Sequence, residues 1–511
     1  MFVKCRMLKK LFPLMIVDVL FMSGCVNNNG EVLDYPFEDK NMFFGLTILK
    51  NDLDYELAAE LNVSWVSMQP VVIWFFCEPT PGVYNWSGLD EQITKIQELG
   101  LDCTPVIYPL NVFNDSDRER LIENITLMHG VLPFLRSENA SRFKLYPHNL
   151  STSLQWKVFL KNLVDRYDGD GENDMPGLKY PVRYWHFLEE YPETWLGDVN
   201  VYVGLLKMSA PVIKYEDPNA KVVLLGLASN YARAFAFADG FIDDPDAGVF
   251  NSTKYTREQI ANNPLFQQEK NGFEYILSEG DGYFDVADIH LYEEKLSFMD
   301  GKIKWLKSKM MSDKPIWCIE GGGPFKIPNG TSPKHGDPYF GFYTDKENAE
   351  FVVKMHVLGA VEGVERFHWS LAGTADNSFW DGPWWVMGLT TYDREKKPSY
   401  YTFETMMDFL RDFQSVSRIN GVSNGVPLSL YHFETPGGDV YVVWDDSENW
   451  HGVDLSWFLN LTGKTVEVTP IITEVDPVTR QPIQPSLPHY GDPNVIPVSV
   501  TPVFVTLNPE V

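Results

Sequence analysis

Eight short apolar runs, alternating with longer amphipathic segments, constrain the fold of this chain more than any other feature of its sequence. The runs are bounded by Gly, Pro and Asn, as buried strands are, and the segments between them carry apolar residues at three- and four-residue spacing, as helices do. Strands that alternate with helices form a parallel sheet, and eight such units close a (β/α)8 barrel. The expected strands are Phe43–Leu46, Trp65–Gln69, Cys103–Tyr108, Tyr184–Leu188, Val222–Leu227, Val286–His290, Ile316–Ile319 and Arg366–Trp369. The expected helices include Asp52–Leu61, Leu89–Leu99, Ser153–Tyr167, Val201–Tyr215, Met299–Met310 and Glu347–Ala360.

The pattern changes after a further helix expected near Tyr400–Phe413. From there the runs alternate between apolar and polar residues, as half-buried strands do, with turns at Gly437-Gly438 and Gly463. These runs predict a small antiparallel β-sandwich, with strands at Leu428–Phe433, Asp439–Trp444, Thr465–Thr469 and Val498–Leu507. We expect the barrel to span residues 41–412 and the sandwich to span residues 413–511.

The N-terminal residues have the order of a secretory signal. Basic residues at positions 4, 6, 9 and 10 precede an apolar run from Leu11 to Met22, which ends at Ser23-Gly24-Cys25. Small residues directly before a cysteine resemble the lipobox of prokaryotic lipoproteins, which implies a signal over residues 1–25, a lipidated Cys25 and a polar tether over residues 26–40. An ordinary cleaved signal or an uncleaved anchor is the alternative, because Asp18 and Met22 depart from the best pattern. In each version we expect the protein outside the cytoplasm, lipid-anchored at the extracellular face of the membrane or secreted.

Charge and motifs exclude several classes of function. The 511 residues include 42 basic and 70 acidic ones, and the net charge of −28 repels nucleic-acid phosphates, whereas a neutral partner such as carbohydrate fits. Cys77, Cys103 and Cys318 lie in strand-like contexts without CxxC spacing, so we expect buried free thiols. The sequence has no P-loop, dinucleotide fingerprint, HExxH motif or nucleophile elbow, and we expect no organic cofactor.

Two of the expected strands end in glutamate. The segment YWHFLEE ends at Glu189 and Glu190, and the segment PIWCIEG carries Glu320. Reactive groups of a barrel enzyme stand at the C-terminal ends of its strands, and hydrolysis of a glycosidic bond needs two facing carboxyl groups. The sequence therefore predicts that Glu190 and Glu320 face each other across the barrel mouth as a catalytic pair.

The segments around these residues resemble clan A glycoside hydrolases, such as families 5, 39 and 42. The stretch from Asn62 to Pro109 is similar to the second and third βα units of that clan. RYWHFLEEYPE resembles its strand-four segment, and KPIWCIEGGG resembles its strand-seven segment. The resemblance covers roughly residues 42–410 and implies a retaining hydrolase of β-linked glycans, with Glu190 as general acid/base and Glu320 as nucleophile.

The same resemblance extends to residues that surround the pair. FDVADIHLYE is similar to the strand-six segment, where His290 and Tyr292 match residues that line the site and brace the nucleophile. Trp369 matches the aromatic floor of the sugar subsite, and GLTTYDREKKPSYYTFETM resembles the stretch that closes such barrels. These matches imply that Tyr292 orients Glu320 and that His290 and Trp369 shape the subsite.

Two positions depart from the clan. Position 189 is Glu where the clan has an Asn that contacts the sugar 2-hydroxyl, and Ser67 stands where the clan has an Arg that supports the nucleophile. We expect Glu189 to contact the sugar, or to be the acid itself if the strand register is shifted by one. Both departures favour an alternative function, a catalytically weakened surface lipoprotein that binds oligosaccharide. A purely structural surface protein is a third interpretation, but it leaves the tryptophans of residues 380–385 unexplained.

Aromatic residues near the expected mouth predict platforms on which sugar rings stack. Trp74, Phe75 and Phe76 follow the second strand, although core packing is an equal alternative for Phe75 and Phe76. A loop after the eighth strand carries three more tryptophans, Trp380, Trp384 and Trp385. The segment Gly321–Thr344, rich in Gly and Pro, is expected to form a lid or a subsite wall.

One acidic segment has the spacing of a metal loop. Oxygen-bearing side chains occur at every second residue in Asp168, Asp170, Glu172 and Asp174, as they do in calcium loops. The segment lacks the rest of an EF-hand pattern, so a polar turn is the alternative. We expect no other metal site.

Overall fold

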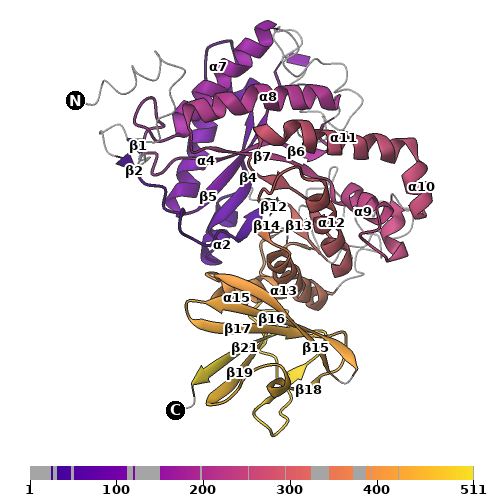
Figure 1. Ribbon diagram of the computed structural model, residues 1–511. Coiled ribbons are helices and arrows are strands. Elements are labelled where there is room, and N and C mark those ends of the chain that lie inside the picture. The colour runs from indigo at the N-terminus through magenta and orange to yellow at the C-terminus, as the bar shows by residue number, and fades with distance from the viewer. Residues whose placement is uncertain are drawn as a thin grey trace, which may run out of the picture.

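A computed structural model of the chain has two domains, the first a barrel and the second a β-sandwich (Figure 1). The structure describes residues 25–26, 32–47, 51–111, 119–120, 123, 150–195, 198–250, 253–293, 295–323, 344–371, 387–391, 393–423 and 425–509. Within these residues, no helix combines the length and the apolar composition needed to cross a membrane.

The first domain contains an eight-stranded parallel sheet. Its strands, in the order in which they pair, are β10 (Ala287–Asp288), β12 (Ile316–Cys318), β14 (Val364–Ser370), β3 (Phe44–Thr47), β4 (Trp65–Ile73), β5 (Asp102–Tyr108), β6 (Tyr184–Tyr191) and β7 (Lys221–Leu227). Parallel bridges from Val223 to Val286 and from Leu227 to Ile289 join the two ends of the sheet. The prediction of a (β/α)8 barrel is therefore confirmed.

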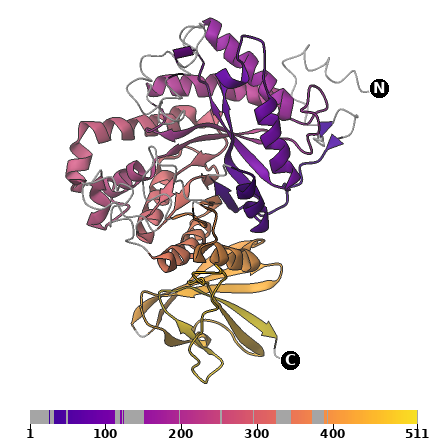
Figure 2. The same ribbon diagram turned by 180° about the vertical axis from the view of Figure 1, so that it is seen from behind.

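Helices surround the sheet, as the view from behind shows (Figure 2). They are α2 (Asp52–Glu60), α3 (Trp74–Cys77), α4 (Ser87–Glu98), α7 (Leu150–Tyr167), α8 (Val199–Glu216), α9 (Ser229–Ala238), α10 (Arg257–Asn262), α11 (Pro264–Gly280), α12 (Leu296–Lys309), α13 (Asp345–Val361) and α15 (Pro398–Leu410). Local sequence sets where some of them begin. Helix α2 starts with a capping box between Asn51 and Asp54, and α13 starts with one between Thr344 and Glu347. Helices α3, α9, α10 and α11 are not among the helices expected from the sequence.

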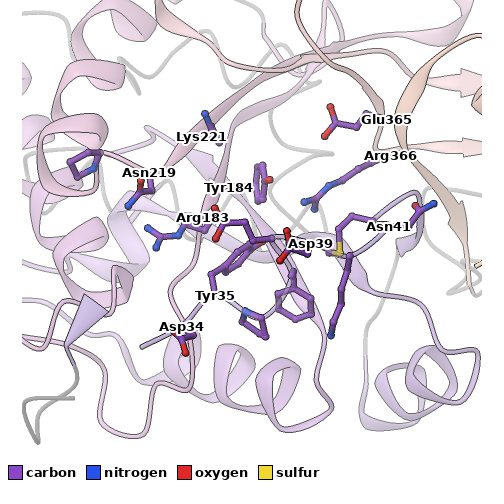
Figure 3. Close-up of a pocket in the computed structure, with 16 residues that line it drawn as sticks. Asp34, Tyr35, Asp39, Asn41, Arg183, Tyr184, Asn219, Lys221, Glu365 and Arg366 are labelled. Atoms are coloured by element: carbon purple, nitrogen blue, oxygen red, sulfur yellow. The ribbon is translucent and has the colours of Figure 1, made fainter. Parts of the chain in front are cut away.

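A segment before the first barrel strand closes the floor of the barrel. Residues 34–42 lie at the amino ends of the strands, where the Tyr35 hydroxyl donates a 2.5 Å hydrogen bond to Asp102. They line a cavity of about 830 Å³, around which Tyr35, Tyr184 and Arg366 are seen in Figure 3. Because Tyr184 begins β6, this cavity lies at the end of the barrel opposite to the strand ends that carry the glutamates.

The second domain is an antiparallel β-sandwich. Its larger sheet pairs β15 (Ser415–Ser423), β16 (Val426–Thr435), β17 (Gly438–Trp444), β21 (Val503–Pro509) and β19 (Lys464–Pro470), and its smaller sheet pairs β18 (His451–Asp454) with β20 (Val495–Val498). The run predicted as one strand from Val498 to Leu507 is divided between β20 and β21. The C-terminal β-sandwich is thus confirmed, with this correction to its strands.

The sandwich packs directly on the barrel helices, and Figure 1 shows α13 and α15 between the barrel sheet and the sandwich. The ring of Phe409 on α15 stacks on Phe504 of β21, with ring centroids 5.0 Å apart. The Thr402 hydroxyl on the same helix donates a hydrogen bond of 2.6 Å to the carbonyl of Ile472. Buried side chains of both domains belong to one continuous hydrophobic core.

The buried imidazole of His356 predicts a loss of stability in acid. It lies on α13, stacks on Phe44 and donates a 2.6 Å hydrogen bond to the carbonyl of Val352. Burial lowers the pKa of His356 to about 4. In the unfolded chain the histidine takes up a proton near pH 6.5. The contribution of the neutral ring to the free energy of unfolding is therefore complete above that pH. It is lost as the pH falls toward 4, and the loss amounts to about 3 kcal/mol.

The measurement is the free energy of urea unfolding between pH 7 and 4. We expect the His356→Phe variant to lose about 3 kcal/mol less over this interval than the parent chain. His489→Gln, which changes an exposed histidine, serves as the control and keeps the parent's pH dependence. Equal pH dependence of His356→Phe and the parent would show that the histidine is not buried as a neutral ring.

Candidate active site

A β-bulge sets the direction of the glutamate at the end of β6. The register between β6 and β7 shifts between Phe187 and Glu190, so that Glu190 pairs with Gly226. Leu188, inside this irregularity, has a φ of 67°, in the left-handed region that a branched side chain rarely adopts. Bulges next to sites commonly re-aim a side chain. As a result Glu190, and not Glu189, lies against the other acidic strand end.

Glu190 and Glu320 face each other across one histidine. The Nδ1 atom of His290 lies 2.8 Å from Oε1 of Glu190 and 3.4 Å from Oε2 of Glu320. One oxygen of each carboxylate and this nitrogen all lie within 4.8 Å of one another. The Tyr292 hydroxyl donates a 2.9 Å hydrogen bond to Oε2 of Glu320. The glutamate side chains keep 12% and 15% of their surface exposed, so the pair is accessible from the mouth.

Asp288, which is not among the site residues predicted from the sequence, lies behind the imidazole of His290. Nε2 of His290 lies 3.2 Å from Oδ2 of Asp288, and Oδ1 of Asp288 accepts a 3.1 Å hydrogen bond from the amide of Ile319. Alternation along a strand places residues 288 and 290 on the same face, which is the signal that could have identified Asp288. Asp288 therefore lies behind the ring as a charged neighbour, while the other ring nitrogen points at the two glutamates.

The charges of this cluster compensate one another. Burial by itself lowers the pKa of His290, but Glu320 and Glu190 outweigh it and raise that pKa well above its ordinary value. Burial raises the pKa of Glu320 overall, although the positive charge of His290 and the hydroxyl of Tyr292 act in the opposite direction. The arrangement places the imidazole between two carboxyl groups, whose negative charge favours its protonated form.

The two residues that depart from the clan are both engaged in hydrogen bonds. The Tyr108 hydroxyl, at the end of β5, donates to Oε2 of Glu189, and both side chains are buried. The Ser67 hydroxyl donates a 3.0 Å hydrogen bond to the carbonyl of Ile319 and contacts Nδ1 of His368. Ser67 thus ties β4 to the strand that precedes Glu320.

Two aromatic predictions need correction. Trp74 is fully buried, its indole N–H donates a 2.5 Å hydrogen bond to Glu78, and its ring packs on Trp156, so it is not an exposed sugar platform. The reason is that α3 begins at Trp74 and turns the side chain toward α7. Phe75 is also buried, whereas Phe76 is half exposed.

Trp369 is likewise fully buried, and its indole N–H donates a 2.8 Å hydrogen bond to the carbonyl of Met387. The structure therefore gives no support to Trp369 as an exposed floor of a sugar subsite. The residues predicted as a tryptophan loop, Trp380, Trp384 and Trp385, and most of the predicted lid, residues 324–343, lie outside the described residues.

The predicted calcium loop forms a compact turn after α7. Oxygens of Asp168, Asp170 and Asp174 lie within 4.8 Å of one another. They also accept hydrogen bonds from backbone amides of the same turn, among them that of Gly171 to Asp174 at 2.7 Å. These bonds are those of a polar turn, and calcium binding stays a prediction. Cys77, Cys103 and Cys318 are buried free thiols, as predicted.

Gly226 packs so closely against Asp288 and His290 that no side chain fits at this position, and this leads to a prediction. A Cβ atom at this position would lie 2.3 Å from Oδ2 of Asp288 and 2.3 Å from Nε2 of His290. We expect Gly226→Ala to displace the histidine, to destabilise the fold by about 1–3 kcal/mol and to lower activity. Thermal unfolding and turnover of the variant are the measurements.

Gly204→Ala is the matched control for that experiment. Gly204 lies inside α8, and a Cβ there would have no atom within 4 Å. This variant should be more stable than the parent by about 0.5–1 kcal/mol, because alanine favours the helix. Equal behaviour of the two variants would contradict the close approach at Gly226.

The first domain is thus a (β/α)8 barrel with two opposed carboxylates at its mouth, followed by a C-terminal β-sandwich, and several solved glycoside hydrolases share this fold. A family 39 glycoside hydrolase from the gut symbiont Bacteroides cellulosilyticus WH2 has this fold, with 13% sequence identity and a TM-score of 0.58 over 92% of this chain and 81% of that one. A glucosidase from Croceicoccus marinus gives 12% identity and a TM-score of 0.51, covering 95% of this chain and 98% of its own. A monomeric β-xylosidase from Caulobacter crescentus CB15 gives 11% identity and a TM-score of 0.50 over 96% and 98%. No family model and no curated protein matches the sequence.

Proposed function

We propose that this protein is a retaining glycoside hydrolase that acts on β-linked oligo- or polysaccharide. The observation that carries the proposal is the pair of glutamates at the carboxyl ends of two barrel strands, with one oxygen of each within 4.8 Å. Retaining enzymes hold their two carboxyl groups about 5–5.5 Å apart, and inverting enzymes hold them about 6.5–9.5 Å apart to admit a water. The close approach of one oxygen from each glutamate agrees with the retaining arrangement.

In the proposed reaction, Glu190 protonates the oxygen of the leaving group while Glu320 attacks the anomeric carbon and forms a glycosyl-enzyme ester. Glu190 then takes a proton from water, and that water displaces Glu320 from the sugar. Tyr292 orients the attacking carboxylate through its 2.9 Å hydrogen bond. No organic cofactor takes part in either step.

The proposed substrate is a neutral glycan, which the net charge of −28 does not repel. We propose that the protein meets it outside the cytoplasm, anchored by lipid at Cys25 or secreted, because of the signal-like order of residues 1–25. Loss of membrane association in a Cys25→Ser variant tests the anchor.

The stereochemistry of the first product tests the function. We expect reducing sugar to be released from at least one member of a panel of β-linked polysaccharides and aryl β-glycosides. Proton NMR of the fresh product should show the β-anomer first, because two displacements restore the starting configuration. Initial appearance of the α-anomer would instead require an inverting reaction and remove Glu320 as a nucleophile.

An oligosaccharide-binding protein is the second candidate. Glu189 and Ser67 favour this binding function, because the hydrolases of the clan have other residue types at these two positions. Both side chains are engaged in hydrogen bonds within the protein. No sugar release across the panel, together with saturable oligosaccharide binding in calorimetry, would establish this second function in place of the first.

A further inference from the structure

We infer that Glu190, His290 and Glu320 form a binding site for a transition-metal dication such as Zn²⁺, and that the bound ion switches the enzyme off. Binding of the ion is independent of the proposed function, whereas its inhibitory effect rests on that function. The site is built from one imidazole nitrogen and two carboxylate oxygens that belong to three different strand ends.

The three ligand atoms have the spacing that one small ion requires. His290 Nδ1 lies 2.8 Å from the Glu190 oxygen and 3.4 Å from the Glu320 oxygen, and all three atoms lie within 4.8 Å of one another. Zinc bonds to nitrogen and oxygen are near 2.0–2.2 Å, so two ligands in a tetrahedral site stand roughly 3.3 Å apart. Small side-chain movements therefore bring all three atoms onto one ion, which replaces the proton between Nδ1 and Glu190.

The ligands are already oriented by a second layer of contacts. Oδ2 of Asp288 lies 3.2 Å from Nε2 of His290, on the side of the ring where the carboxylate partner of a metal-binding imidazole stands. Asp288 is itself anchored by the amide of Ile319. Tyr292 holds the Glu320 carboxylate through its hydroxyl. These contacts reduce the reorganisation that ion binding would otherwise require.

The donor set selects the class of ion. Imidazole nitrogen suits Zn²⁺, Co²⁺, Ni²⁺ and Cu²⁺, whereas Ca²⁺ and Mg²⁺ prefer sites made wholly of oxygen. The two carboxylates balance the charge of a dication. Such an ion occupies the lone pair with which Glu320 attacks and the oxygen from which Glu190 delivers its proton. Substrate and ion therefore compete for the same two carboxylates.

Isothermal titration calorimetry with ZnCl₂, on full-length protein without added histidines, tests the inference directly. We expect one ion per chain and a weaker interaction with CaCl₂ and MgCl₂. His290→Gln should abolish binding, and Asp288→Asn should weaken it by about 10–100-fold, the usual effect of removing such a second-layer partner. Co²⁺ provides a second readout, because its visible absorption bands should appear with the parent and not with His290→Gln.

Two further variants keep the test decisive. Glu320→Gln removes a ligand from the accessible side of the site and replaces His290→Gln if that variant does not fold. The double change Asp170→Asn with Asp174→Asn removes the acidic cluster of the turn after α7, and Zn²⁺ binding should be unchanged. Absence of Zn²⁺ binding to the parent, or binding that survives both His290→Gln and Glu320→Gln, would overturn the inference.

The outcomes also separate this inference from the proposed function. Zn²⁺ binding at these residues without any glycoside hydrolysis would leave the metal site standing and reject the hydrolase. Hydrolysis that is unaffected by Zn²⁺, with no ion bound, would reject the metal site alone. Hydrolysis that is inhibited competitively by Zn²⁺ and restored by EDTA would support both.

Discussion

Replacing Glu320 by Ala is expected to reduce kcat/KM for an aryl β-glycoside by on the order of 10⁴-fold or more, since the variant has no group that can form the covalent intermediate of the proposed reaction. The side chain receives the Tyr292 hydroxyl at 2.9 Å and faces His290 at 3.4 Å, so no neighbouring carboxylate can take its place without moving the histidine. Steady-state kinetics and burst-phase product release are the measurements.

Glu190→Gln separates the two carboxylates by their roles. General acid catalysis contributes typically about 10²–10⁴-fold, and this contribution matters less when the leaving group needs no proton. We therefore expect Glu190→Gln to lose far more activity on a natural disaccharide than on a dinitrophenyl glycoside, whereas Glu320→Ala loses both. Glu258→Gln, which changes an exposed glutamate on α10, is the matched control and should retain full activity. More than a tenth of the parent's activity in Glu320→Ala would contradict the assignment.

Replacing Arg366 by Met is expected to destabilise the folded protein by about 3–5 kcal/mol, because it leaves a buried carboxylate without its cation. Arg366 is almost completely buried at the floor of the barrel, 3.5 Å from Asp102. Its guanidinium lies 4.2 Å from the ring centroid of Tyr184 and 4.3 Å from that of Trp317. Both the ion pair and these ring contacts are lost in the variant. The free energy of urea unfolding at pH 7 measures the effect.

Two variants control this stability experiment. Arg411→Met removes an exposed arginine that pairs with its neighbour Asp412, and it should change stability by less than about 0.5 kcal/mol. Adding Asp102→Asn to Arg366→Met removes the unpaired charge, so the double variant should be more stable than Arg366→Met alone. A loss below about 1 kcal/mol in Arg366→Met would show that Asp102 is neutral or hydrated in the folded barrel.

Several features of the molecule were accessible from local sequence. The eight apolar runs predicted the eight barrel strands because a strand that is buried on both faces is apolar throughout and short. Glu190 and Glu320 could be placed at one end of the barrel because parallel strands present their carboxyl ends together. The resemblance to clan A glycoside hydrolases depended on the same strand ends, and solved glycoside hydrolases share the fold of this chain.

Other local patterns were harder to interpret. Helices α9, α10 and α11 occupy the stretch between β7 and β10, where the periodicity is interrupted at Asn263-Pro264 and no single long helix is indicated. The run at Val498–Leu507 was predicted as one strand, yet the chain leaves the smaller sheet after Val498 and joins the larger sheet at Val503. Sequence periodicity indicates a strand but does not show which sheet it pairs with.

The sequence by itself determined the order of the eight barrel strands, the two domains' classes and the strand ends that carry acids, because these depend on residues close together along the chain. Only the tertiary structure decided that the bulge at Leu188 turns Glu190 toward Glu320, that Asp288 lies behind His290, and that Trp74 is buried. Each of these depends on distances between residues on different strands and helices. Such distances are set by barrel closure and core packing, which no local pattern records.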